Sequence, residues 1–263
     1  MIPKVIHYCW FGKGQMSELA ERCIASWKSV LPDYTLKLWD ESTFDVSSNA
    51  YVREAYNSKK YAFVTDFVRL YVLYNFGGVY MDTDVEVLQP LDSFLSNEAF
   101  SGFENESEVP TGIMASEAGY WAFGELLKQY DNRHFIGHDG IPDLTTNVKV
   151  ITKFYEELGL KKNNQKQTIA GCLFMPSIVF CPGPEDINNR NVGKIVTIHH
   201  KSGSWLPPNL RADRSSTRYK AKVAMKKVLK TFLGMDKYGK MIRAVNRCRK
   251  LETYDELNKK NSK

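Results

Sequence analysis

The sequence predicts an α/β fold, in which helices pack against an open sheet. Two patterns support this class. Residues 4–41 alternate strand, helix and strand, and an apolar helix over residues 59–76 leads directly into a further strand. Apolar residues make up 43% of the 263 residues and charged residues 25%, as in ordinary soluble proteins, so the chain has enough apolar side chains for a sizeable core.

Local spacing predicts the elements of the first half. Residues 4–12 (KVIHYCWFG) and 34–41 (YTLKLWDE) read as strands, and the second alternates apolar with polar positions. Between them, Ser17 is the expected N-cap of a helix with one apolar face. Over residues 59–76, apolar positions recur three and four apart on more than one side, which predicts a mostly buried helix that ends at Gly77.

The later elements follow from shorter patterns. We expect a strand over residues 79–88 (VYMDTDVEVL), helices over 120–130 and 147–159, and a strand that runs into a loop over 194–205 (KIVTIHHKSGSW). Three tryptophans are expected in the core: Trp27, Trp39 and Trp121.

The net charge of +6 hides a division of the chain. Residues 211–263 carry 17 Lys+Arg against 5 Asp+Glu, whereas residues 1–210 carry 19 against 25. We therefore expect a mildly acidic α/β domain over 1–210 and a basic helical tail over 211–263. Within the tail, residues 218–250 interleave basic residues with apolar ones at helical spacing.

Two interpretations of this tail stay open. A basic amphipathic helix can lie on an anionic membrane surface, or the segment can form a helical hairpin packed on the body with its basic face in water. Nucleic acid is not an expected partner, because neither an aromatic platform nor a recognition motif accompanies the charge.

The cysteines and the N-terminus favour a cytoplasmic protein. The five cysteines are far apart and form no C-x-x-C pair, which argues against a disulfide framework or a zinc ribbon. The first residues show no charged segment followed by an apolar one, and no run approaches the roughly 18 apolar residues of a membrane span. We expect a cytoplasmic protein, which would be peripheral at the inner face of the plasma membrane if the tail lies on that surface.

Residues 77–87 (GGVYMDTDVEV) contain the most informative motif. Alternate side chains of a strand share a face, so we expect Tyr80, Asp82 and Asp84 to point to one side. Two such carboxylates repel each other unless a cation lies beside them, and carboxylate oxygens suit hard ions such as Mg²⁺ or Mn²⁺. A solvated turn is the alternative, since D-x-D is common by chance.

The preceding helix carries two charges among apolar neighbours. Asp66 and Arg69 are three residues apart and therefore share a helical face. Charges embedded in such a helix are costly unless they are paired or used. The pair is either a structural ion pair, or a binding site in which Asp66 contacts hydroxyls and Arg69 contacts a phosphate or sugar oxygen.

The combination of these motifs resembles a known family. Residues 64–91 (VTDFVRLYVLYNFGGVYMDTDVEVLQPL) are similar to the core of the glycosyltransferases with a DXD-containing sugar-binding region, family 32. That family groups bacterial capsular and lipopolysaccharide transferases with yeast initiating mannosyltransferases. The catalytic domains of the clostridial glucosylating toxins are more distant relatives. The similarity extends over about residues 1–100, with a shorter echo at 198–205 (IHHKSGSW).

The resemblance implies a GT-A fold, a Rossmann-like sheet, as the catalytic domain over residues 1–210. It also implies a nucleotide-sugar donor, a divalent metal and transfer with retention at the anomeric carbon. By match to the family motif, Trp10 stacks on the nucleobase and Tyr80 lies beside the donor. Asp66 and Arg69 match the pair that holds the donor sugar.

The metal site follows from the same resemblance. Asp82 matches the aspartate that touches ribose and sugar, and Asp84 matches the metal ligand. Relatives supply a further ligand just before a tryptophan in a late loop, where His200 and Trp205 fit best and His199 is the rival. An imidazole suits Mn²⁺ better than Mg²⁺. Two partly exposed histidines at a strand end are the alternative.

These inferences predict transfer of a hexose from a nucleotide-sugar, expected to be a UDP-sugar. The expected acceptor is a lipid-linked glycan in bacterial surface polysaccharide synthesis. The polar loop over 137–147 either lines the acceptor cleft, through His138, Asp139 and Asn147, or is an ordinary surface loop.

Two other functions are alternatives to this one. A haloacid-dehalogenase-type phosphatase would use Asp82 as nucleophile, with Lys128 and residues 139–143 (DGIPD) completing its site. That alternative leaves Asp66 and Arg69 without a role. The other is a non-catalytic protein that binds sugar or membrane on the same fold.

Overall fold

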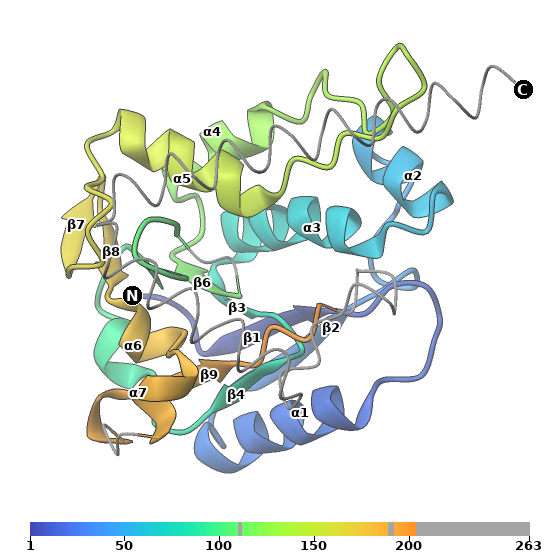
Figure 1. Cartoon of the computed structure of the whole chain (residues 1–263). Coiled ribbons are helices and arrows are strands. Elements are labelled where there is room, and N and C mark those ends of the chain that lie inside the picture. The colour runs from blue at the N-terminus through green and yellow to red at the C-terminus, as the bar shows by residue number, and fades with distance from the viewer. Residues whose placement is uncertain (110–111, 189–191, 204–263) are drawn as a thin grey trace, which may run out of the picture. The chain divides into compact units, whose positions relative to one another are not determined.

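The described part of the chain is a mixed α/β structure. The computed structural model describes residues 1–109, 112–188 and 192–203, all within the unit Met1–Trp205. A seven-stranded sheet lies between layers of helices, and a two-stranded sheet lies beside it (Figure 1). The predicted α/β class is confirmed. The basic tail lies outside the described residues, so its helical character and the boundary at residue 210 stay predictions.

The main sheet combines a parallel and a mixed half. In sheet order its strands are β2 (Thr35–Trp39), β1 (Val5–Cys9), β3 (Gly78–Met81), β6 (Ile113–Ser116), β5 (Ala99–Gly102), β8 (Cys172–Met175) and β7 (Gln167–Ile169). Strand β1 pairs in parallel with both β2 and β3, whereas β6 runs antiparallel to β3 and β5. Strands β5 and β8 are parallel, and β7 is antiparallel to β8. The small sheet pairs β4 (Val85–Val87) with β9 (Thr197–His199).

Helices cover both faces of the sheet (Figure 1). The helices are α1 (Glu18–Val30), α2 (Ala50–Asn57), α3 (Tyr61–Phe76), α4 (Trp121–Lys128), α5 (Asn147–Glu157), α6 (Ser177–Phe180) and α7 (Pro184–Asn188), with 3-10 turns at Asp92–Phe94 and Val192–Lys194. Buried residues of α2 to α5 form one core with the sheet, and those of α1 and α6 form the second core. Helix α2 was not predicted; the Asn49 side chain caps it by accepting the Val52 N–H at 3.3 Å.

The helix ends that the sequence predicted are confirmed. The Ser17 side chain accepts the Ala20 N–H at 3.2 Å and so caps α1. Helix α3 ends at Gly77, whose φ of +65° favours glycine. A Cβ at Gly77 would lie 2.7 Å from the Ala118 backbone nitrogen, so the approach of the neighbouring chain also requires glycine there.

The single strand predicted over residues 79–88 is wrong, because the chain turns within the D-x-D motif. Strand β3 ends at Met81, and the Val85 N–H donates to the Asp82 carbonyl at 3.0 Å to close the turn. The continuation, β4, leaves the main sheet and pairs with β9. Aspartate is poorly suited to strand interiors and favours turns. Tyr80, Asp82 and Asp84 therefore do not share the face of one strand.

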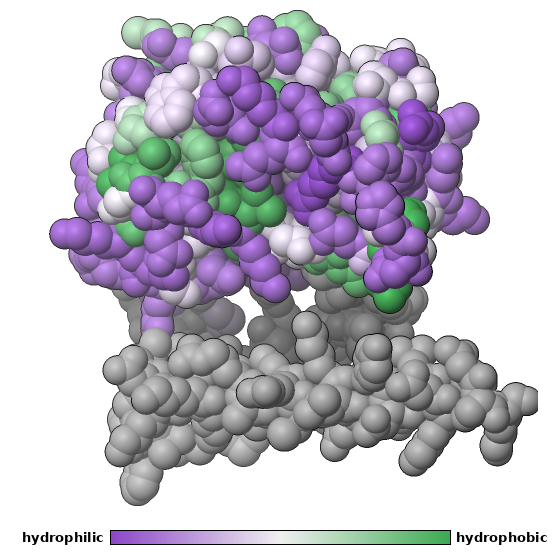
Figure 2. Space-filling view, turned by 90° about the horizontal axis from the view of Figure 1, so that it is seen from above, coloured by the Kyte–Doolittle hydropathy of each residue, from purple (hydrophilic) through white to green (hydrophobic). Residues whose placement is uncertain are grey.

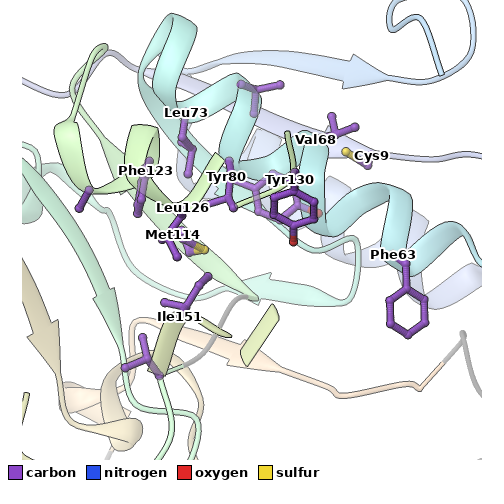
Figure 3. Packing of buried hydrophobic residues seen from close by; sticks show 14 of the residues in the cluster. Cys9, Phe63, Val68, Leu73, Tyr80, Met114, Phe123, Leu126, Tyr130 and Ile151 are labelled. Atoms are coloured by element: carbon purple, nitrogen blue, oxygen red, sulfur yellow. The ribbon is translucent and has the colours of Figure 1, made fainter. Parts of the chain in front are cut away.

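The core between α3 and the sheet positions the motif residues. In Figure 3, Leu73 of α3, Tyr80 of β3 and Met114 of β6 meet Leu126 of α4, and all four side chains are buried. Because α3 is fixed against β3 over this area, the polar residues of both elements are held at constant separation.

Two of the three expected core tryptophans are confirmed. Trp27 is fully buried and donates its indole N–H to the Val85 carbonyl at 2.6 Å, and Trp39 is also buried. Trp121 is 47% exposed, so that prediction is wrong. It begins α4, whose buried residues, Ala122, Phe123 and Leu126, define a face from which position 121 points away.

Hydrophilic residues cover most of the face seen in Figure 2, with smaller hydrophobic areas between them. The exposed apolar side chains of the described residues include Ile141 and Leu144 in the polar loop. Among the residues the structure describes, every helix is too short or too polar to cross a bilayer.

His7 is a buried histidine whose two ring nitrogens are both used. Its Nδ1 accepts the Trp39 indole N–H at 3.0 Å, so its Nε2 carries the proton and donates to the Gly77 carbonyl at 2.9 Å. Burial lowers the pKa of His7 to about 4; the Gly77 carbonyl opposes this shift and the Lys37 charge adds to it. The neutral ring thus joins β1 to the end of β2 and to the end of α3.

We expect the stability of the protein to fall as His7 becomes protonated. The folded-state pKa of His7 lies below the ordinary value of about 6.5, so its neutral ring contributes fully to stability above that pH. This contribution is lost as pH falls through about 4. The loss is on the order of 3 kcal/mol. Urea unfolding from pH 7 to pH 4 should show a shallower pH dependence for His7→Gln than for wild type. The exposed His134→Gln is the control, and equal slopes for His7→Gln and wild type would contradict the assignment.

Candidate functional site

The site forms where two parallel strands end beside each other. Trp10 is the first residue after β1, and Asp82 is the first after β3. These strands pair in parallel, with His7 opposite Tyr80, so their carboxyl ends meet at the same edge. Strand β1 connects onward to β2 on its other side, which makes this edge a topological switch point, where open α/β sheets bind ligands.

Arg69 is the centre of a buried polar group at this edge. Its Nη2 lies 3.1 Å from Asp82 Oδ1 and 3.4 Å from Asp66 Oδ1, and its side chain is only 5% exposed. The guanidinium lies over the Tyr80 ring, 4.7 Å from its centroid. The Tyr80 hydroxyl donates to the same Asp82 oxygen at 2.9 Å. The structure thus brings together four residues that the sequence singled out.

Burial and charge act in opposite directions on these groups. Burial raises the pKa of Asp66 to about 6, although the positive charge of Arg69 opposes the shift. Burial also favours the neutral form of Arg69, but the charges of Asp82 and Asp66 outweigh it and hold the pKa of Arg69 above its ordinary value. Arg69 therefore stays charged, and Asp66 keeps its proton up to a higher pH than an ordinary aspartate does.

Asn147, the first residue of α5, lies against Asp66. Its backbone N–H donates to Asp66 Oδ2 at 3.2 Å, and its Nδ2 donates to the Asp66 carbonyl at 3.0 Å. The residue is 2% exposed, and its Oδ1 has no hydrogen-bond partner among the described residues. The sequence pointed to Asn147 only as part of an acceptor loop. The sequence did contain a signal, because Asn147 begins a predicted helix, and the free backbone N–H groups at a helix N-terminus attract acidic groups.

A second polar cluster shares Asp82 with the first. Ligand atoms of Asp82, Asp84 and His199 all lie within 4.8 Å of one another. His199 Nε2 is 3.3 Å from Asp84 Oδ1, and Asp84 Oδ2 accepts the Ser202 N–H at 2.7 Å. Neighbouring ligands of an octahedral ion with bonds of about 2.1 Å are about 3 Å apart, so these two side chains fit one small divalent cation.

Charges in this cluster favour ionised side chains. Burial opposes ionisation of Asp84, but the hydrogen bond and charge of His199 and the Ser202 amide hold the pKa of Asp84 below its usual range. Burial likewise favours neutral His199, but Asp84 raises the pKa of His199 to about 10. A cation that binds here must therefore displace a proton from His199.

The structure places His199, and not His200, with the two aspartates. Successive residues at the end of β9 point to opposite sides, so His200 Nε2 lies 2.7 Å from Glu86 Oε2 instead. The His200 backbone N–H donates to the Asp84 carbonyl at 2.9 Å. His200, which fitted best by sequence, thus supports the strand pairing next to the cluster.

Among the other predicted residues, Trp10 lies at the same sheet edge as Asp82. Trp205 is outside the described residues. The indole N–H of Trp10, which is partly buried, donates to the Gly14 carbonyl at 2.6 Å. Asp139 accepts the Ile141 N–H within its own loop, where His138 is exposed.

The residues required by the phosphatase alternative do not gather around Asp82. Lys128 forms an ion pair with Glu125, 2.6 Å away, and Asp143 forms one with Arg133, also at 2.6 Å. The partners of Asp82 are Arg69 and Tyr80 instead. The geometry gives this alternative no support.

Known proteins are similar to the part of this chain that contains Asp66, Arg69, Asp82 and Asp84. Residues 17–101 match a protein family described as the glycosyltransferase sugar-binding region containing a DXD motif. Inositol phosphoceramide mannosyltransferase 3 of Schizosaccharomyces pombe is 32% identical over 126 residues, which are 45% of this chain and 34% of that protein. Mannosyl phosphorylinositol ceramide synthase SUR1 of Saccharomyces cerevisiae is 28% identical over 175 residues, 62% of this chain and 45% of that protein.

The chain thus spans less than half the length of these curated relatives. Among solved structures, the PaToxG glycosyltransferase aligns with a TM-score of 0.43 and 18% identity, over 60% of this chain and 70% of that one.

Proposed function

We propose that this chain, whose residues 17–101 form a DXD-containing glycosyltransferase sugar-binding region, transfers a hexose from a nucleotide-sugar with retention at the anomeric carbon. The observation that carries the proposal is the position of Asp82. It belongs both to the buried group around Arg69 and to the cluster with Asp84 and His199. A sugar and a pyrophosphate joined by one bond would need two such neighbouring sites.

The two groups have separate tasks in this proposal. A divalent cation held by Asp82, Asp84 and His199, Mn²⁺ or Mg²⁺, would offset the negative charge that develops on the departing nucleoside diphosphate. Arg69 adds fixed positive charge on the sugar side. Asp66, held in place by Asn147, orients sugar hydroxyls, so that binding energy positions the anomeric carbon. The buried packing of α3 against β3 keeps these groups in place.

The sugar and the acceptor follow from the relatives. The names of the two relatives described above contain a mannosyl group and an inositol phosphate ceramide, and both proteins are fungal. GDP-mannose is therefore tested as a donor together with the UDP-hexoses. A glycolipid is tested as an acceptor together with the expected lipid-linked glycan. These fungal relatives give no support to the narrower expectation of bacterial surface polysaccharide synthesis. Attachment of residues 218–250 to an anionic membrane at a cytoplasmic face stays part of the proposal.

A donor screen tests the proposal. Purified protein is incubated with GDP-mannose, UDP-glucose, UDP-galactose or UDP-N-acetylglucosamine, with and without Mn²⁺. We expect metal-dependent release of nucleoside diphosphate from one donor. Absence of turnover with every donor, together with phosphate release from simple phosphomonoesters, would overturn the proposal in favour of a phosphatase.

Replacing Asn147 should weaken use of the donor. Asn147→Ala removes the Nδ2 bond to the Asp66 carbonyl, so Asp66 is held less firmly in the donor site. The loss of this bond should lower kcat/KM for the donor about 10- to 100-fold. Asn75→Ala, which loses a comparable bond to the Tyr71 carbonyl on exposed α3 surface, is the control. An unchanged kcat/KM for Asn147→Ala would remove this residue from the donor site.

A further inference from the structure

His199 is supported on the side of its ring that faces away from Asp84. Its Nε2 is directed at Asp84 Oδ1, 3.3 Å away. Its Nδ1 lies 3.9 Å from the Sγ of Cys181, within the range of a hydrogen bond to sulfur. A histidine that binds a cation through one nitrogen usually donates the other N–H to a fixed partner, which sets the tautomer and the tilt of the ring.

Gly112 lies against the same edge of the imidazole. A Cβ added at Gly112 would be 2.7 Å from His199 Nδ1 and 2.9 Å from Cε1, closer than real contacts allow. The carbonyl of Gly112 also accepts the Asp82 N–H at 2.8 Å. This one residue therefore contacts two of the three members of the cluster, and a side chain there would push His199 away from its position.

Cys181 is held firmly enough to serve as a partner. It is buried, and it ends α6 with its N–H donating to the Ser177 carbonyl at 2.7 Å. The hydroxyl of Thr197, in the same strand as His199, donates to the Phe180 carbonyl at 2.8 Å. The Val196 N–H donates to the Val179 carbonyl at 2.8 Å. Helix α6 and strand β9 thus hold the sulfur and the imidazole at a constant separation.

We propose that Gly112 and Cys181 are positioning residues for His199. The sulfur accepts the Nδ1–H and so leaves Nε2 for a divalent cation, and the missing side chain at 112 lets the ring approach Asp82 and Asp84. The inference rests on the metal centre of the proposed function. Neither residue contacts the cation itself, and neither belongs to the sequence motifs.

Cation affinity tests this role without relying on turnover. Mn²⁺ binding to the full chain is measured by electron paramagnetic resonance in the presence of excess GDP and, separately, UDP. We expect Cys181→Ala and Gly112→Ala each to weaken Mn²⁺ binding about tenfold or more. Cys172→Ala, a buried cysteine beside Tyr155, and Gly124→Ala, where a Cβ would crowd the Tyr74 ring, should bind as wild type does.

A conservative variant separates positioning from packing. Cys181→Ser keeps an acceptor for the Nδ1–H, so its affinity should lie within about threefold of wild type. Equal losses in Cys181→Ser and Cys181→Ala would overturn the role of the sulfur as acceptor. Thermal unfolding of each variant shows whether it folds; if Gly112→Ala does not, the pair of Cys181 variants still decides.

The electron spin echo signal of an imidazole nitrogen on Mn²⁺ distinguishes the two possible failures. His199→Ala should abolish this signal. If it does, and Cys181→Ala and Gly112→Ala bind Mn²⁺ as wild type does, the positioning role is wrong and the metal centre stands. If wild type shows no Mn²⁺ binding, or His199→Ala leaves affinity and signal unchanged, the metal centre fails, and the inference fails with it.

Discussion

Asp84→Asn should reduce metal-dependent release of nucleoside diphosphate about 10³-fold, a loss of about 4 kcal/mol of transition-state stabilisation. Asp84 Oδ1 faces His199 and its Oδ2 accepts the Ser202 N–H, so the carboxylate fixes the ligand cluster from both oxygens. The amide has nearly the same shape but lacks the charge that a divalent cation requires. The measurement is kcat/KM for the donor that the screen identifies, at saturating Mn²⁺.

The control for this variant is Asp131→Asn. Asp131 is exposed and follows α4, where its only hydrogen bond in the described residues is made by its backbone N–H. Asp131→Asn should keep full activity, and thermal unfolding should show that Asp84→Asn is folded. Near-normal turnover by a folded Asp84→Asn protein would refute the assignment of Asp84 as a cation ligand.

Arg69→Met should destabilise the protein by about 3 to 5 kcal/mol at neutral pH, because it leaves Asp66 and Asp82 without their buried counter-charge. The methionine keeps much of the side-chain volume, so the effect reports the charge. Urea unfolding at pH 8 gives the free energy of unfolding, and donor turnover should fall at least 100-fold in the same variant.

The pH dependence of this loss has a definite sign. The pKa of Asp66 is raised to about 6 even with Arg69 present, and removing the positive charge raises it further. A raised carboxyl pKa means that ionisation destabilises the fold, and this penalty grows as pH rises from about 4 through the folded-state pKa. The difference between wild type and Arg69→Met should therefore be smaller at pH 5 than at pH 8. Adding Asp66→Asn to Arg69→Met should recover part of the loss.

Other results for these variants would contradict the role proposed for Arg69. A loss of stability that is independent of pH and unrelieved by Asp66→Asn would indicate that packing, and not charge, is what Arg69 supplies. Full donor turnover in Arg69→Met would exclude the arginine from the sugar site.

Contacts between residues close in the sequence could be predicted, because the geometry of a single helix or turn relates them. Asp66 and Arg69 are three apart in a helix, and the structure places them 3.4 Å apart. The Ser17 cap and the end of α3 at Gly77 follow from the same kind of local rule. The α/β class itself follows from the alternation of strand and helix periods in residues 4–41.

Local rules failed where tertiary pairing decided the outcome. Residues 79–88 were predicted as one strand, but β4 pairs with β9, more than a hundred residues later in the chain, and the motif turns between Asp82 and Asp84. The same pairing selects His199 over His200, since the register of β9 determines which imidazole faces the carboxylates. Asn147 reaches Asp66 only because the tertiary fold brings the start of α5 to α3.

Most residues of the site can be identified in the sequence: an aspartate and an arginine on a buried helix, and two aspartates after a strand. The histidine that joins them, and the role of Asp82 as the link between the two polar groups, are visible only in the folded chain. This difference arises because secondary structure depends on side chains a few residues apart. The site depends on contacts such as Asp84 with His199, which no local periodicity relates and which form only when distant strands pair.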